Sequence, residues 1–110
     1  MPHAELKYSN DLQIDAVVIL AAIEQTILRH DAGSGECKGR AYPTDIFHHS
    51  HLILNLSMLK KAHRDSAFTA ALMTDLEQIV KENIPQSCFF SFTLEYSKGT
   101  YVTNFYEGTS

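Results

Sequence analysis

The chain has 110 residues, of which 45% are hydrophobic and 20% charged, and its net charge is −4 at pH 7. This length predicts one domain, residues 1–110, with one modest core. The acidic balance gives no indication of a nucleic-acid partner or of binding to an anionic membrane. The longest apolar run, "AVVILAAI", is too short to span a bilayer, and no leader peptide is recognisable, so we expect a cytoplasmic protein. Two cysteines are too few for a disulfide framework.

The first half of the chain predicts a strand, a helix and a second, weaker strand. Residues 3–9 alternate, with Ala4, Leu6 and Tyr8 on one face, which is typical of a half-buried strand. A helix is expected over 12–29, with its cap at residues 10–11 and an apolar stripe along one side. Glycines end this helix, and the segment 39–47 predicts an irregular strand with Pro43 at its edge.

The second half predicts the same order of elements. The clearest strand is "HLILNLSM" at 51–58, with four apolar side chains on one face. A helix follows from about residue 62 to 83, and Pro85 stops it. The run "CFFSFTLEY" then predicts another alternating strand, and the tail predicts a turn at Lys98–Gly99 and one further short strand.

The two halves indicate a duplicated unit. Segments 2–9 and 50–57 share a histidine, a leucine and a serine at the same offsets, which supports pseudo-repeats over about 2–47 and 49–97. Two βαβ units in one sheet predict a ferredoxin-like α+β fold, with two helices on one face of a four-stranded sheet. The other sheet face carries Ile53 and Phe89, so we expect this face to meet another subunit.

The second residue is the most distinctive chemical feature. Pro2 contributes little to a strand, because it has no N–H and its φ angle is fixed. If Met1 is removed, however, Pro2 becomes a free secondary amine, and an α-amine titrates at about 7.7–8.0. If Met1 is retained, the same nitrogen is an amide and is not basic. The alternative interpretation is that Pro2 only permits removal of the methionine.

Four short segments carry a resemblance to a known family. They are "MPH" opening a strand, "KGR" before the middle strands, "HLILNLSMLKKAHR" leading into the second helix, and "TNF" near the end. Together with the doubled βαβ order, they make the chain similar to the tautomerase superfamily, and more narrowly to its 5-carboxymethyl-2-hydroxymuconate isomerase branch. The resemblance implies a homotrimer without metal or organic cofactor. It also implies a place in aromatic-compound catabolism, with the site near the proline at a subunit boundary.

The resemblance further implies that Pro2 acts as the general base of a keto–enol tautomerase on a small carboxylated enol or oxo-acid. The family's Arg-x-Arg segment corresponds to Lys38 and Arg40 here, and further substrate-binding cations correspond to Lys60, Lys61 and Arg64. Lysine cannot bind a carboxylate through two parallel hydrogen bonds as arginine does. The match therefore does not establish that this chain acts on the substrate of the isomerase branch.

Each of these residues also has a simpler interpretation. The five cations are expected either to bind carboxylates or to be solvated charges, and Phe105 either walls a pocket or packs in the core. His48, His49 and His51 offer at most two convergent ligands, whereas zinc requires three or four, so we expect no metal site. The alternative function is a ferredoxin-like oligomer that binds a ligand or partner without performing chemistry.

Overall fold

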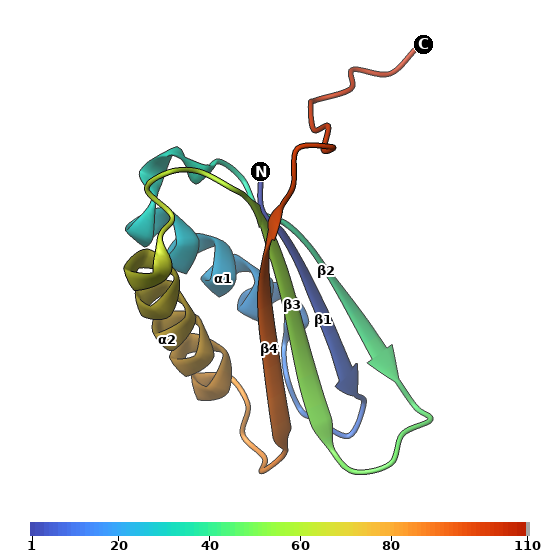
Figure 1. Cartoon of the computed structure of the whole chain (residues 1–110). Coiled ribbons are helices and arrows are strands. Elements are labelled where there is room, and N and C mark those ends of the chain that lie inside the picture. Colours follow the sequence, from blue (N-terminus) through green and yellow to red (C-terminus); the bar gives the residue numbers. More distant parts are fainter. Residues whose placement is uncertain (110) are drawn as a thin grey trace.

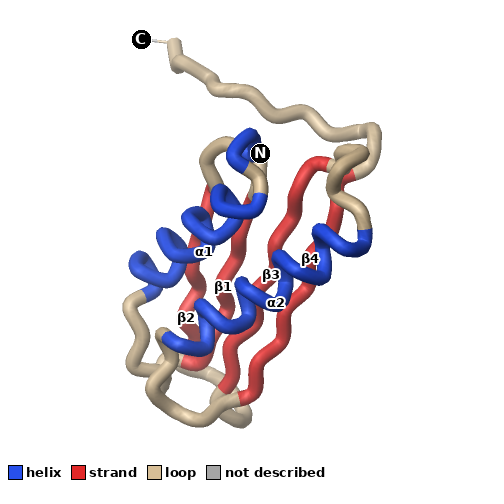
Figure 2. The backbone as a smooth tube through the Cα atoms, turned by 90° about the vertical axis from the view of Figure 1, so that its left-hand side faces the viewer, coloured by secondary structure: helices blue, strands red, loops and turns tan. Residues whose placement is uncertain are grey.

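Residues 1–109 are described by a computed structural model, which has two layers (Figures 1 and 2). One layer is a sheet of four strands, and both helices cover the same face of it. The elements follow the chain as β1 (His3–Ser9), α1 (Ala16–His30), the 3-10 turn η1 (Ala32–Ser34), β2 (Lys38–Thr44), β3 (His51–Leu59), α2 (Ser66–Glu82) and β4 (Phe89–Ser97).

The strand order is β2-β1-β3-β4, so each βαβ half contributes two neighbouring strands. β1 runs parallel to β2, and β3 runs parallel to β4, as a helical crossover between neighbouring strands requires. The halves meet where β1 pairs antiparallel with β3 in the centre of the sheet. The predicted α+β architecture, with two helices on one face of a four-stranded sheet, is confirmed.

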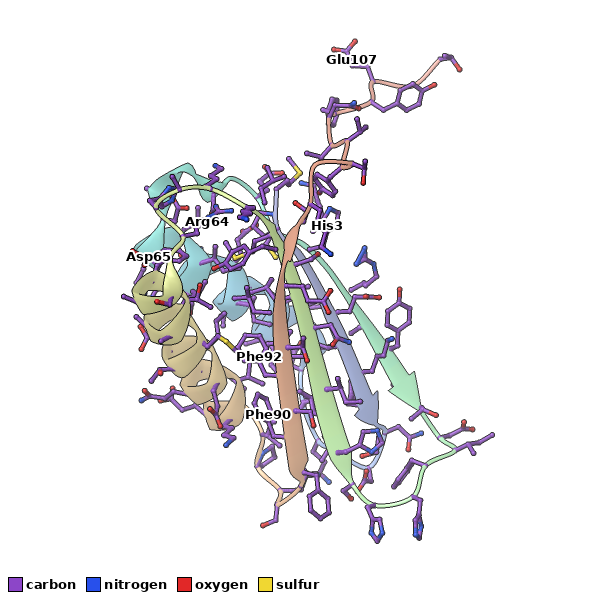
Figure 3. The ribbon with its side chains drawn as sticks, viewed as in Figure 1. His3, Arg64, Asp65, Phe90, Phe92 and Glu107 are labelled. Carbon is purple, nitrogen blue, oxygen red and sulfur yellow. The ribbon has the colours of Figure 1, made fainter. Side chains whose placement is uncertain are left out.

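The core lies between the sheet and the helices. Alternation in β1 and β3 turns one side of each strand into the core, as with Leu6 and Leu54 at 0% exposure, while Tyr8 near the end of β1 is partly buried. The helices contribute matching stripes, and β4 adds a partly buried apolar row; Figure 3 shows Phe90 and Phe92 of this row pointing toward the helix layer. The buried residues of the two helices are Ile19, Ile23, Thr26, Ile27, Leu72, Leu76 and Val80.

Both helices begin a few residues later than the sequence predicts. The helix cap expected at residues 10–11 is wrong: α1 is capped by Asp15, whose carboxylate accepts a hydrogen bond from the Val18 N–H. Leu12 is only 5% exposed, but it fills the core from a loop. Similarly, Asp65 caps α2 by accepting from the Phe68 N–H, so α2 begins at Ser66. The apolar period gave the buried face of α2 correctly, but it did not single out that of α1, where Val17 and Val18 are exposed and Ile19 is fully buried. The competing caps decided the helix ends.

The two weakest strand predictions have different outcomes. β2 forms at the edge of the sheet and includes Pro43, which an edge strand tolerates because one side of its backbone has no ladder partner. The short strand expected in the tail is wrong, since residues 98–109 contain no strand. Figure 1 shows this tail leaving the body beside the amino terminus. Within residues 1–109, no helix is long and apolar enough to cross a membrane.

Candidate functional site

The topology brings several strand ends to one edge of the sheet. β1 and β2 begin there, and the antiparallel β3 and its parallel partner β4 end there. Pro2 lies at this edge and is buried. Its carbonyl accepts a hydrogen bond of 2.9 Å from the Lys38 N–H, which extends the β1–β2 ladder to the start of the chain. The position of Pro2 is therefore fixed by backbone pairing.

The electrostatic surroundings of the amino terminus favour a neutral amine. Burial lowers the pKa of the terminal amine below its ordinary value, and the positive charges of Arg64 and Lys61 lower it further. Both effects disfavour the charged ammonium form. In the intact chain this amine belongs to Met1, and Pro2 lies one residue closer to the buried strand. A neutral amine is what a base at this edge requires.

A polar pocket of about 390 Å³ opens on the sheet face that the helices leave uncovered. His3, Glu5 and Arg40 line it from β1 and β2, and Asn55, Thr93 and Glu95 line it from β3 and β4. Among residues 1–109, the buried Nη1 of Arg40 has no hydrogen-bond partner. Arg40 therefore retains a free donor for an anionic ligand.

His3 belongs to the same pocket and lies next to Pro2. Burial lowers the pKa of His3, and the neighbouring Arg40 guanidinium lowers it further, so its imidazole is held toward the neutral form. The sequence placed His3 on the outward face of β1 but gave no reason to assign it to a site. The alternation of β1 could have indicated it, because residues 3 and 5 of β1 lie on the same face of the sheet as residue 40 of the neighbouring β2.

The other predicted cations are distributed around this edge. Lys38 begins β2 and pairs with the exposed Glu36 at 2.8 Å. Lys60 lines a second pocket of about 500 Å³, together with Leu59, Ser97, Lys98, Gly99 and Tyr101. Lys61 is exposed and acts on the amino terminus through its charge. The structure thus brings Lys38, Arg40, Lys60 and Lys61 to one end of the molecule.

Arg64 does not fit the predicted role of a residue that contacts substrate. Its side chain is 1% exposed, and its Nε and Nη2 donate to Asp31 Oδ2 at 3.1 and 2.8 Å. Its Nη1 donates to the Leu59 carbonyl at 2.7 Å. Arg64 therefore anchors the loop after β3 to the end of α1, and it influences the amino terminus through its charge (Figure 3).

Phe105 lies outside the pockets of this edge. It is 86% exposed and belongs to the tail that extends from the body. Neither of the two pockets beside the amino terminus includes it. Its predicted role in substrate binding therefore stays a prediction for an assembled oligomer.

The histidine-rich loop lies away from the amino terminus. His48 and His49 are exposed between β2 and β3, with ring centroids 4.0 Å apart. Among residues 1–109, no group of three or more His, Cys, Asp or Glu side chains is arranged to hold a metal ion.

Cys37 lies near the amino terminus, and burial together with Glu24 raises the pKa of its thiol to about 11, so this thiol stays protonated.

Several solved structures of known proteins have a similar fold. A 5-carboxymethyl-2-hydroxymuconate delta-isomerase matches with a TM-score of 0.77 at 18% identity, over 96% of this chain and 88% of the other. A 5-carboxymethyl-2-hydroxymuconate isomerase from Deinococcus radiodurans R1 matches with a TM-score of 0.69 at 18% identity, over 94% of this chain and 89% of the other. A fused 4-OT symmetric trimer matches with a TM-score of 0.67 at 16% identity, over 98% of this chain and 94% of the other. No protein-family model and no curated protein matches the sequence.

These neighbours share the two-layer βαββαβ architecture. The fold that the resemblance implied is therefore confirmed. At sequence identities of 18% or less, a similar structure shows the fold alone. The chemistry has to be inferred from the residues of this chain.

The Asp31–Arg64 pair predicts a stability loss in acid. Its neighbours lower the pKa of Asp31 to about 2 from an ordinary 3.8, chiefly through the hydrogen bond from His63. Because the folded pKa is depressed, this stabilisation is present above pH 4 and is lost between about pH 4 and pH 2. We expect the difference in unfolding free energy between wild type and Asp31→Asn to shrink by about 2 kcal/mol over that window.

Urea unfolding at fixed protein concentration measures this difference. At pH 7, Asp31→Asn should destabilise by about 3 kcal/mol, because it leaves the buried guanidinium unpaired. Asp45→Asn is the matched control, since Asp45 is exposed in the β2–β3 loop. A pH-independent difference between wild type and Asp31→Asn would contradict the assigned role.

Proposed function

We propose that this protein is a cofactor-free keto–enol tautomerase with the amine of Pro2 as its general base, formed by removal of Met1. The observation that supports it best is the placement of Pro2. This residue is buried and fixed by the β1–β2 ladder, at an edge where burial and two cations lower the pKa of the amino terminus. A lowered pKa increases the share of the amine that is unprotonated near neutral pH, and such a base needs no metal or organic cofactor.

The proposed reaction moves one proton within the substrate. The Pro2 nitrogen takes a proton from a carbon beside a conjugated carbonyl, and the electron pair of that C–H bond forms a new double bond. The carbonyl π pair moves to oxygen and gives a dienolate. The protonated amine then returns a proton to another carbon or to oxygen, so no electrons leave the substrate.

The cations around Pro2 favour a substrate with a carboxylate. Arg40 offers a free donor in one pocket, and Lys60 lines the other pocket at the same edge. Lys38 and Lys61 add positive charge beside these pockets. We therefore propose a small unsaturated oxo-acid as substrate, with 5-carboxymethyl-2-hydroxymuconate as one candidate. Arg64 supports the base through its charge, while its own hydrogen bonds hold the loop.

We also propose that the chain works as a homotrimer. Large apolar side chains are exposed on several elements, including Val17 at 76% on α1 and Phe89 at 71% on β4. Exposed apolar groups of this size favour an interface between subunits. A neighbour of the same fold is a symmetric trimer, which agrees with this proposal.

The alternative function is an oligomer that binds a ligand or partner and performs no chemistry. It is favoured if Met1 is retained, since an amide nitrogen has no available lone pair. Intact mass of the protein from its native host separates the two. A mass without methionine supports the enzyme, and quantitative retention supports the binding protein.

The first functional prediction concerns Pro2. In protein shown by mass to lack Met1, ketonisation of small enol-acids should rise with pH through one base whose pKa lies below that of an ordinary α-amine. Pro2→Ala keeps an amine but changes its placement, so kcat/KM should fall by about 10-fold or more. Ultraviolet absorbance of the conjugated enol follows the reaction.

Acylation of the terminus is the decisive control for Pro2. It preserves the residue and removes the lone pair, so turnover should stop. Unchanged turnover after complete acylation would show that another group is the base.

A second prediction concerns Arg40. Arg40→Ala should raise KM for carboxylated enols by about 10-fold, because it removes a charged hydrogen-bond donor, and should have much less effect on enol ketones without a carboxylate. Lys7→Ala removes a cation from β1 that does not line the pocket, so its KM should stay near wild type. Equal effects of Arg40→Ala on both substrate types would refute carboxylate binding by Arg40.

The oligomer is tested directly by light scattering. At micromolar concentration we expect three times the mass of one chain. A monomeric mass would overturn the trimer and any role of Phe105 that depends on a neighbouring subunit.

A further inference from the structure

The tail crosses the amino terminus immediately after β4. The hydroxyl of Tyr101 lies 3.1 Å from His3 Nε2 and 3.4 Å from the carbonyl oxygen of Met1. Two residues later, Thr103 Oγ1 lies 4.0 Å from Met1 Sδ. Figure 1 shows the tail and the amino terminus leaving the same end of the sheet. Residues 101–103 therefore lie against the residue that covers the Pro2 nitrogen.

The carbonyl of Met1 marks the space in front of that nitrogen. Its carbon is bonded to Pro2 N, so it occupies the direction in which a free amine would hold its lone pair. Amide geometry places its oxygen about 2.3 Å from the nitrogen. The Tyr101 hydroxyl is therefore within about 6 Å of Pro2 N, on the side where a reacting carbon and its conjugated oxygen would lie.

The hydrogen bonds give the Tyr101 hydroxyl a defined direction. A phenol has one proton to donate. Here the hydroxyl donates toward the Met1 carbonyl, so the bond to His3 requires the imidazole to donate from Nε2. A neutral imidazole with its proton on Nε2 satisfies this requirement. His3 thus holds the hydroxyl so that its proton points at a carbonyl oxygen.

We propose that Tyr101 is a catalytic residue whose hydroxyl donates a hydrogen bond to the substrate oxygen that becomes the enolate, with His3 as its positioning residue. This inference rests on the proposed function of Pro2. The hydroxyl keeps its proton throughout. The C–H pair forms the new double bond, the carbonyl π pair moves to oxygen, and the Pro2 amine carries the abstracted proton.

The surroundings of Tyr101 support this role. Tyr101 lines the pocket of about 500 Å³ that also contains Lys60 and Lys98, so there is room for a small acid beside its ring. Among residues 1–109, the buried Oγ of Ser97 in the same lining has no partner. A donor aimed at the site of developing negative charge stabilises a transition state more than a ground state.

The test compares two tyrosines of the same tail. Tyr106 is 71% exposed and lines neither of the two pockets beside the amino terminus. Protein lacking Met1 is assayed with phenylenolpyruvate, a conjugated enol-acid. Its ketonisation passes through the same enolate in the reverse direction, with the enol proton going to the amine and a proton from the ammonium going to carbon, and is followed in the ultraviolet. We expect Tyr101→Phe to lower kcat by about 10- to 100-fold with KM within about threefold, since the lost donor acts on the enolate. Tyr106→Phe should keep the wild-type kcat and KM.

The possible results are distinguishable. A wild-type kcat in Tyr101→Phe would overturn the role of Tyr101 while leaving Pro2 as the base. Equal losses in Tyr101→Phe and Tyr106→Phe would also overturn it, because the tail would then act without a specific hydroxyl. If wild-type protein shown by mass to lack Met1 turns over none of a panel of enol-acids, the proposed function fails and this inference fails with it. Equal melting temperatures of the three proteins show that folding does not cause the difference.

Discussion

The antiparallel pairing of β1 with β3 is the constraint on which the arrangement of the molecule depends. Each βαβ half has to keep its own two strands parallel, because a helix returns the chain to the same end of the sheet. The central pairing then turns the second half over relative to the first. As a result, two strand beginnings and two strand ends share one edge. This edge receives the amino terminus, the loop after β3 and the start of the tail from distant parts of the chain.

The charge at this edge differs from that of the whole molecule. The chain is acidic overall, yet cations gather here because β2 begins and β3 ends next to Pro2. Asp31 neutralises much of the charge of Arg64, and the remaining field still disfavours an ammonium group at the chain start. The overall composition therefore gave no information about this local field.

Periodicity in the sequence predicted the parts of the fold that burial dictates. The alternation around Leu6 and Leu54 has one stable solution, which is to face the helices. Periodicity did not decide the start of α1, because Asn10, Asp11 and Asp15 are all good caps, and in the structure Asp15 caps the helix while Leu12 packs into the core from a loop. The burial of Arg64 was also not predictable, since it depends on Asp31, 33 residues away. Nor was the contact of Tyr101, which spans 98 residues and lies in a segment without periodicity.

The contact between the amino terminus and the start of the tail has a practical consequence for preparing this protein. An affinity tag fused ahead of Met1 would leave the Pro2 nitrogen an amide and would add bulk at the mouth of both pockets. A tag at the carboxyl end avoids the first problem and is separated from Tyr101 by the exposed residues 102–109. Strong overexpression can exceed the capacity of the host's methionine aminopeptidase and give mixed termini. Samples of the same sequence would then differ in activity according to how they were produced, although their folds would be the same.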